Sequence, residues 1–419
     1  MINKQHTRDF FQPEPNRMLK AWVKKFTGLN DPVYVLSLLY VASLPFLKIL
    51  PVVFISLMGV VAIFGYRWKI AFPTWLNNYS SWCLLGLYLL YVLNLFFTSN
   101  TEETIVKLSV KFSYLMLPLL LIPSASFKKQ QIFNLLKAFI LGTSLSILVN
   151  FLISFSHYIQ TNNTAWFFYE RISGFHHTSY YAFYVGFAAL AILYLMRKHQ
   201  LKHRLPALIL FFLHAGMVFM ISSKAGILAF IFALAVESFM RVLKHKNIKN
   251  IALLTGSLVI VCLIVNYNVR MNNTISNLIN KNKSIELRDT RLQIWKTCTT
   301  LIPEHFWTGT GAGDTTDKLT EQYKKNNFYV AAQKRLNCHN QFFQTQLSSG
   351  IFASILLIMS FVFIIVNHKA KFEGIIWIFI LMVFIHFLFE AILETQSGVQ
   401  FIAFFLVLFS YQQQKFARL

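Results

Sequence analysis

The sequence predicts an all-α polytopic membrane protein with about twelve transmembrane helices and one long, partly helical extracytoplasmic loop between helices 9 and 10. Of its 419 residues, 56% are hydrophobic and only 13% are charged, against roughly 25% charged residues in an average soluble domain. The apolar residues form runs of about 18 or more that Lys and Arg flank, as in membrane-spanning helices. Such a chain is expected to form one helical bundle rather than several soluble domains.

The basic residues between the apolar runs predict the topology. The formal net charge of +23 comes mainly from basic residues in short loops, and the positive-inside rule assigns such loops to the cytoplasm. The sequence has no basic stripe of the kind that indicates nucleic-acid binding. The alternation of basic and less basic loops places both termini in the cytoplasm. The predicted helices cover residues 33–47, 49–66, 81–97, 108–123, 132–155, 179–196, 205–221, 226–240, 251–267, 341–366, 374–393 and 398–411.

Three segments follow from these boundaries. Residues 1–267 are expected to form helices 1–9, residues 268–339 a periplasmic loop domain, and residues 340–419 helices 10–12. The N-terminal residues show no apolar core before a cleavage site, so we expect no signal peptide.

The long loop contains one predicted helix and one glycine-rich turn. Residues 286–302 are expected to form a helix that stops before Pro303, because the residue before proline disfavours helical backbone. The motif GTGAGD at residues 309–314 has no preceding strand and no P-loop lysine, which argues against a nucleotide site. It indicates a tight turn, with Asp314 capping a short polar helix that ends near Asn326.

Several cations are predicted to face the outer leaflet. Arg288 and Arg291 border the apolar stripe of the loop helix, where arginines suit bidentate capture of phosphate oxygens; the alternative is a helix docked on the membrane with snorkelling arginines. Lys224 follows two serines at the turn between helices 7 and 8, where a helix N-terminus favours anions. A cationic pocket of this kind fits a diphosphate head group. Other cations on this side are Lys107, Lys111 and Arg171.

A histidine and two carboxylates are candidates for acid–base chemistry. His339 is expected to begin helix 10 at the outer surface, where a neutral imidazole acts as a general base or is merely an interface residue. His386, Glu390 and Glu394 recur every four residues, on one face of helix 11. Ionisable groups inside a membrane are functional candidates, and Glu390 is expected to orient His339 or an acceptor hydroxyl.

Cys298 and Cys338 lie in the long loop, where they form either a disulfide or two free thiols. The chain has no CxxC pair, which argues against a zinc site. The sequence also shows no Asp/Glu cluster arranged to hold a divalent metal.

Together these features resemble the O-antigen ligase family, whose superfamily also contains O-antigen polymerases and protein O-oligosaccharyltransferases. The resemblance rests on the topology and on the segments RDTRLQIWK, GTGAGD and HNQFFQTQLSSG. His339 with Asn340, and Gly350 further along, is similar to the family's histidine motif, and Arg291 matches the loop arginine. Lys224 stands where the family usually has a second arginine; it keeps the charge and loses the bidentate fork.

The resemblance implies an inverting glycosyl transfer that needs no cofactor and no metal. The donor would be a glycan on undecaprenyl diphosphate in the bacterial inner membrane, and the acceptor lipid A-core, as in lipopolysaccharide biosynthesis. His339 would be the base, and Arg291 and Lys224 would bind the diphosphate. Arg288, Lys111 and Arg171 would add charge, and Asn340 and Glu390 would support the site.

Three alternatives remain open from the sequence. An O-antigen or exopolysaccharide polymerase and a protein O-oligosaccharyltransferase belong to the same superfamily and differ in the acceptor. A polysaccharide or lipid-carrier flippase belongs to another class, which internal repeats would favour; we find none.

Overall fold

The computed structural model describes residues 31–65, 75–124, 127–244, 256, 290–366 and 374–416, and within these ranges every regular element is a helix. Predicted helix 9, apart from Gly256, lies outside the described residues. So does the first part of the long loop, including Arg288.

Seven described helices are long and apolar enough to cross a membrane, judged by length and composition, so the chain is a multi-pass membrane protein. They are Tyr79–Phe96, Thr101–Leu121, Lys129–Thr161, Thr178–Arg197, Arg204–Ile221, Lys224–Leu243 and Gln341–Val366. Shorter apolar helices span Pro32–Ser43, Ile49–Ile63, Gly374–Phe389 and Gln396–Ser410. Each of these helices corresponds to one of the predicted helices. The count of twelve and the periplasmic side of the loop stay predictions.

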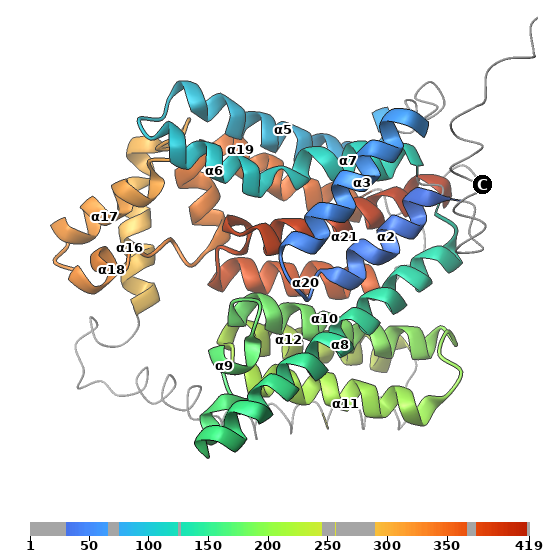
Figure 1. Ribbon diagram of the computed structural model, residues 1–419. Coiled ribbons are helices and arrows are strands. Elements are labelled where there is room, and N and C mark those ends of the chain that lie inside the picture. Colours follow the sequence, from blue (N-terminus) through green and yellow to red (C-terminus); the bar gives the residue numbers. More distant parts are fainter. Residues whose placement is uncertain are drawn as a thin grey trace, which may run out of the picture.

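The helix α10 (Thr178–Arg197) lies at the centre of the bundle and is 89% buried. It packs against α8 (Lys129–Thr161), α11 (Arg204–Ile221), α12 (Lys224–Lys244) and α20 (Gly374–Phe389) (Figure 1). Small residues allow this close approach, since a Cβ on Gly226 would clash with Ala182. Close backbone packing of this kind is what associates helices in lipid, where apolar burial supplies no driving force.

The remaining spans surround this centre in pairs. The helix α2 (Pro32–Ser43) forms a hairpin with α3 (Ile49–Gly65) and packs against α8. The helix α5 (Tyr79–Leu93) packs against α19 (Gln341–Val366). The helix α7 (Ser113–Ser124) packs against α21 (Gln396–Phe416). An aromatic cluster fills the space between α8, α10, α20 and α21. Its members are Phe139, Phe183, Phe187, Phe379, Phe401 and Phe405.

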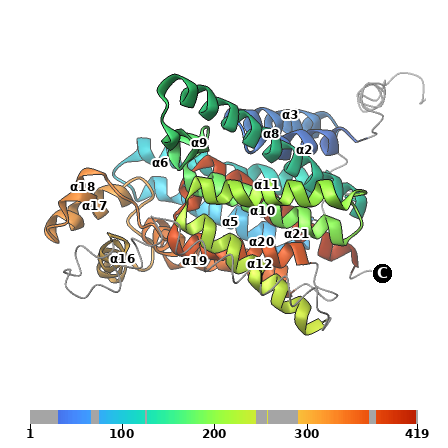
Figure 2. The ribbon, with the colours of Figure 1, turned by 90° about the horizontal axis from the view of Figure 1, so that it is seen from below.

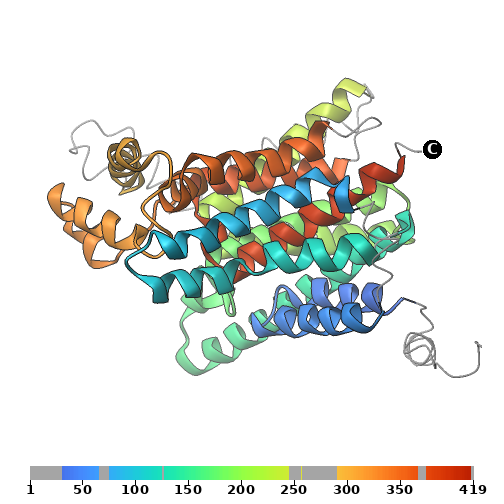
Figure 3. The ribbon, with the colours of Figure 1, turned by 90° about the horizontal axis from the view of Figure 1, so that it is seen from above.

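The described part of the long loop forms a small helical unit beyond one end of the bundle (Figures 1, 2 and 3). It consists of α16 (Thr290–Leu301), α17 (Thr315–Lys325) and α18 (Tyr329–Gln333). As predicted, the first of these ends before Pro303. The unit has its own core, which includes Ile294, Cys298, Leu319, Tyr323 and Cys338.

Three differences from the predicted helix boundaries change the arrangement most. Predicted helix 4 is divided at Phe112 into α6 (Thr101–Lys111) and α7, and α8 continues to Thr161. The third difference affects the site: α20 ends at Phe389, and a short 3₁₀ turn at Ile392–Glu394 follows. Glu390 and Glu394 therefore do not share a helical face with His386, and the expected periodicity is wrong for these two carboxylates.

A glycine breaks α19 where the loop unit docks on it. Gly350 has φ 75° and ψ −171°, and a Cβ at this position would clash with the Trp307 carbonyl. The adjacent backbone bonds the loop instead of its own helix. Thr310 N donates to Leu347 O at 2.6 Å, and Ile351 N donates to Phe306 O at 3.0 Å. The glycine thus attaches the loop unit to the bundle.

We expect Gly350→Ala to lower the free energy of unfolding by about 1–3 kcal/mol, because alanine adds both the clash and a positive φ. Gly59→Ala is the matched control, since nothing lies within 4 Å of a Cβ there; alanine in a helix interior should be neutral or slightly stabilising. Thermal unfolding in detergent measures both. Equal midpoints for the two variants would refute the role assigned to Gly350.

Candidate active site

Glu390 is the point where three separate parts of the chain meet. Its Oε2 bonds His339 Nδ1 at 3.1 Å, and its Oε1 accepts from Arg291 Nη2 at 2.9 Å and from Ser179 Oγ at 3.3 Å. His339 precedes α19, Arg291 lies on α16, and Ser179 lies in the first turn of α10. The structure thus brings Glu390 into contact with the two residues that the sequence singled out, His339 and Arg291.

The backbone around His339 holds the imidazole in place. His339 has φ 41°, a left-handed conformation that is uncommon outside glycine, and its N–H donates to Asn337 Oδ1 at 2.9 Å. The helix α19 begins at Gln341, as the predicted bounds 341–366 have it. His339 therefore precedes the helix instead of beginning it, and Asn340 is the cap. Its Oδ1 accepts from the N–H groups of Phe342 and Phe343 at 2.9 and 3.1 Å, and its Nδ2 donates to Leu388 O at 3.2 Å.

The charge state of Glu390 determines which imidazole nitrogen carries the proton. Burial raises the pKa of this carboxyl, but the hydrogen bond and charge of His339 and the charges of Arg291 and His177 hold it below its usual value. An ionised carboxylate only accepts hydrogen bonds, so Nδ1 donates in either charge state of the imidazole, and in the neutral form the lone pair lies on Nε2. Glu390 is 7% exposed. The side chains of His339 and Arg291 are 27% and 24% exposed, so a substrate can reach both.

The start of α12 reaches the same carboxylate through two serines. Ser223 Oγ lies 3.4 Å from Ser179 Oγ, which donates to Glu390, and it also accepts from Gly226 N at 3.3 Å. Lys224, the first residue of α12, directly follows Ser223. The positive end of a 21-residue helix therefore lies beside the site. Ser179 was not predicted, because a serine at a helix start is an ordinary feature.

A second carboxylate, Glu394, holds its own pair of cations. It accepts from Lys111 Nζ at 2.9 Å, from Lys107 Nζ at 3.2 Å and from Gln344 Nε2 at 3.4 Å. Burial raises the pKa of Glu394, but the two ammonium groups outweigh it and lower the pKa to about 2. Lys111 also donates to Leu393 O at 3.0 Å. Its charge is therefore compensated inside the protein, which was not expected for a diphosphate ligand.

Of the two remaining predicted cations, the structure describes Arg171 alone. Arg171 belongs to the short helix α9 (Glu170–Ser173), and its guanidinium lies 5.0 Å from the centre of the Trp166 ring. Arg288 lies outside the described residues. Cys298 and Cys338 are buried free thiols, which is the second of the two expected states. Burial and the neighbouring Cys298 thiol raise the pKa of Cys338.

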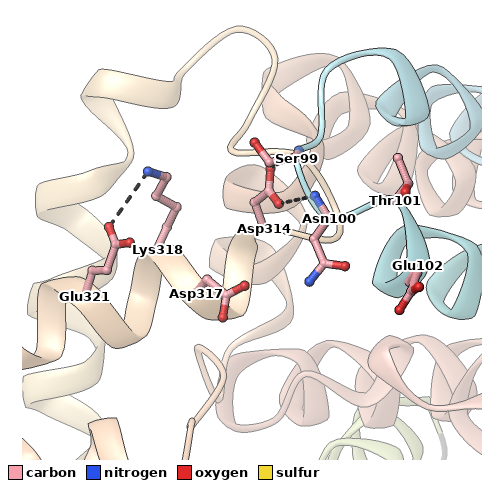
Figure 4. Close-up of a pocket in the computed structure, with 8 residues that line it drawn as sticks. All are labelled: Ser99, Asn100, Thr101, Glu102, Asp314, Asp317, Lys318 and Glu321. Atoms are coloured by element: carbon pink, nitrogen blue, oxygen red, sulfur yellow. Dashed lines mark hydrogen bonds and ion pairs between the residues drawn. The ribbon is translucent and has the colours of Figure 1, made fainter.

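The glycine turn has a different role from the one expected. Asp314 precedes α17, but its carboxylate does not cap this helix. It accepts from Ser99 N at 2.7 Å and from Asn100 N at 2.8 Å (Figure 4), which ties the turn to the loop before α6. A cavity of about 600 Å³ lies beside this anchor. Its lining includes Glu102, Asp317 and Glu321, so it is a poor place for a diphosphate.

We expect Glu394→Gln to lower the free energy of unfolding by about 3–5 kcal/mol, because two buried ammonium groups would lose their counter-charge. Glu321→Gln is the control: its pair with Lys318 is 3.8 Å long and 59% exposed at the glutamate. A pair of this kind contributes about 0–1 kcal/mol. Thermal unfolding measures both variants. An equal fall of the two unfolding midpoints would contradict the expectation.

The stabilisation by Glu394 should depend on pH, which a comparison of the wild type with Glu394→Gln measures. The pKa of Glu394 falls from 4.5 to about 2 on folding, so its stabilisation is complete above about pH 4.5 and is lost as the pH falls through about 2. The difference in unfolding midpoint between the wild type and Glu394→Gln should stay constant at neutral pH and shrink in acid. A difference that shrinks on raising the pH would contradict this assignment.

Comparison of the sequence with models of known protein families finds a match in this part of the chain. The model of the O-antigen ligase family matches residues 207–358, a segment that contains Lys224, Arg291, His339 and Asn340. Glu390 lies beyond it. A search of the curated proteins finds no match. The match to the family model confirms the resemblance to the O-antigen ligase family and supports a membrane glycosyltransferase of the ligase and polymerase superfamily.

Proposed function

We propose that the protein transfers a glycan from undecaprenyl diphosphate to lipid A-core, as an O-antigen ligase, at the periplasmic face of the bacterial inner membrane. Both termini would then lie in the cytoplasm. The observation that carries this proposal is the contact of one buried carboxylate, Glu390, with both His339 and Arg291. This arrangement sets a base beside a cation, which is what a glycosyl transfer with a diphosphate leaving group requires.

In the proposed reaction, His339 is the general base. The acceptor hydroxyl gives its proton to His339 Nε2 while its oxygen attacks the anomeric carbon of the donor sugar. Glu390 holds the imidazole through Nδ1 at 3.1 Å and stabilises the imidazolium as it forms, as a buried carboxylate does for a catalytic histidine. Asn340 supports the base by capping the helix that follows it.

Arg291 and Lys224 act on the other side of the reacting carbon. The bond between this carbon and the diphosphate oxygen breaks, and the electron pair leaves with the diphosphate. Cations positioned before the reaction stabilise the charge that develops on the leaving group. The ion pair with Glu390 orients the guanidinium, and the start of α12 adds its positive end. Since Lys111 and Arg171 have other partners, the proposal assigns diphosphate binding to Arg291 and Lys224.

The alternatives differ in what accepts the glycan or in whether one is transferred. A polymerase and a protein O-oligosaccharyltransferase would use the same base and the same cations. A flippase would need ionisable groups near the middle of the membrane, whereas His339, Arg291 and Glu390 lie at helix ends. This position favours an enzyme.

We expect His339→Ala to lower kcat by about 10²–10⁴, the usual contribution of a general base, and Arg291→Ala by about 10²–10³. Arg291→Lys should recover part of this loss, because lysine keeps the charge. The assay mixes purified protein with lipid-linked glycan and lipid A-core. Arg335→Ala is the matched control, since this loop arginine is exposed and forms its ion pair with the exposed Asp317 at 2.6 Å.

The outcomes separate the candidates. Wild-type turnover by folded His339→Ala would overturn the proposal. Lengthening of the lipid-linked glycan itself, without transfer to lipid A-core, would identify a polymerase, and transfer to Ser or Thr of a protein would identify a protein O-oligosaccharyltransferase. Movement of the donor across proteoliposomes without any transfer would identify a flippase.

A further inference from the structure

A second cavity lies at the end of the bundle opposite to Glu390. The helices α10 and α12 begin beside Glu390, with Ser179 and Lys224, and α20 ends beside it. The last turns of α10 and α12, the first turn of α11 and the first turns of α20 therefore meet at the other end. They surround a cavity of about 1000 Å³. The positive-inside rule predicts the cytoplasmic leaflet for this end.

The lining of this cavity combines cations with an apolar wall. Arg197, Lys198, Arg204 and Arg241 contribute positive charge, and Glu237 is the one carboxylate among the described lining residues. The apolar wall is formed by Val236, Met240, Trp377, Ile378 and Leu381. The cavity is thus suited to a molecule that has a negative group and a hydrocarbon part.

The ion pairs inside the cavity leave part of the positive charge uncompensated. One oxygen, Glu237 Oε1, accepts from Arg197 Nη1 at 2.7 Å and from Arg241 Nε and Nη2, each at 3.0 Å. Arg197 Nη2 is buried and has no hydrogen-bond partner among the described residues. A buried donor without an acceptor costs free energy, so Glu237 does not satisfy all the hydrogen-bond donors of Arg197.

We infer that this cavity binds an anionic phospholipid of the surrounding membrane. The phosphate lies against Arg197, Arg204 and Arg241, and an acyl chain lies along Met240, Ile378 and Leu381. Basic pockets between transmembrane helices are suited to lipid phosphates. A free phosphate ion would satisfy the guanidinium groups but would leave the apolar wall uncovered, so the lipid fits better.

The lipid would join the three helices that also build the site at the other end. The helices α10, α12 and α20 pack against one another. Ser179 lies in α10, Ser223 directly precedes α12, and Glu390 directly follows α20. A ligand that binds only the folded bundle raises its stability by mass action. Anionic lipid should therefore stabilise the protein against heat, and this effect does not depend on the proposed glycosyl transfer.

The test measures thermal unfolding of the full-length protein in detergent as phosphatidylglycerol, phosphatidylcholine or inorganic phosphate is added. The first lipid should raise the unfolding midpoint, and the other two should have little effect. Arg204→Gln should weaken the apparent affinity for phosphatidylglycerol about fivefold, the effect expected of one cation near a lipid phosphate. Arg197→Gln should weaken it at least as much.

The controls distinguish the site from general charge. Lys202→Gln removes one positive charge from the exposed loop just before α11, at a residue that does not line the cavity. This variant should bind the lipid like the wild type. Arg204 is exposed at the start of α11, so its variant remains informative if Arg197→Gln fails to fold. Equal effects of both lipids, equal affinity of Arg204→Gln and Lys202→Gln, or an equal shift with inorganic phosphate would each overturn the inference.

Discussion

The burial of two carboxylates between α20 and α21 determines how the end of the bundle beside the loop unit is built. Glu390 and Glu394 lie four residues apart, and both are almost inaccessible to water. A charge buried in this way is tolerated only when cations and hydrogen bonds compensate it. Glu390 meets His339 and Arg291, and Glu394 meets Lys107 and Lys111. Each carboxylate thus joins helices that are distant in the sequence.

The break after Phe389 is what separates the two sets of contacts. In a continuous helix the two carboxylates would lie on one face and would compete for the same cations. The chain leaves the helix at Glu390 instead, and Gln341 Oε1 accepts the Leu393 N–H at 2.8 Å. Glu390 then bonds the His339 imidazole, while Glu394 compensates the charges of Lys107 and Lys111. Gln344 links the two parts, because it bonds both Glu394 and the Cys338 N–H next to His339.

Positive charge has different roles at the two ends of the bundle. At the Glu390 end, Arg291 pairs with Glu390, Lys107 and Lys111 pair with Glu394, and the start of α12 adds its dipole. At the other end, Arg197 and Arg241 share one oxygen of Glu237, and Arg197 Nη2 has no partner among the described residues. The helices α10, α12 and α20 run between these two ends.

The sequence by itself determined the helical membrane architecture, and it singled out Arg291 of the loop and His339 as candidate site residues. These properties follow from apolar runs, flanking charges and a local motif, all of which are contiguous in the chain. Only the tertiary structure decided which side chains contact Glu390 and which have other partners. Lys111 pairs with Glu394, Arg171 stacks on Trp166, Ser179 joins Glu390, and Asp314 anchors the loop before α6 instead of capping α17. These contacts join residues far apart in the chain or depend on where a helix breaks, and neither periodicity nor spacing specifies such pairings.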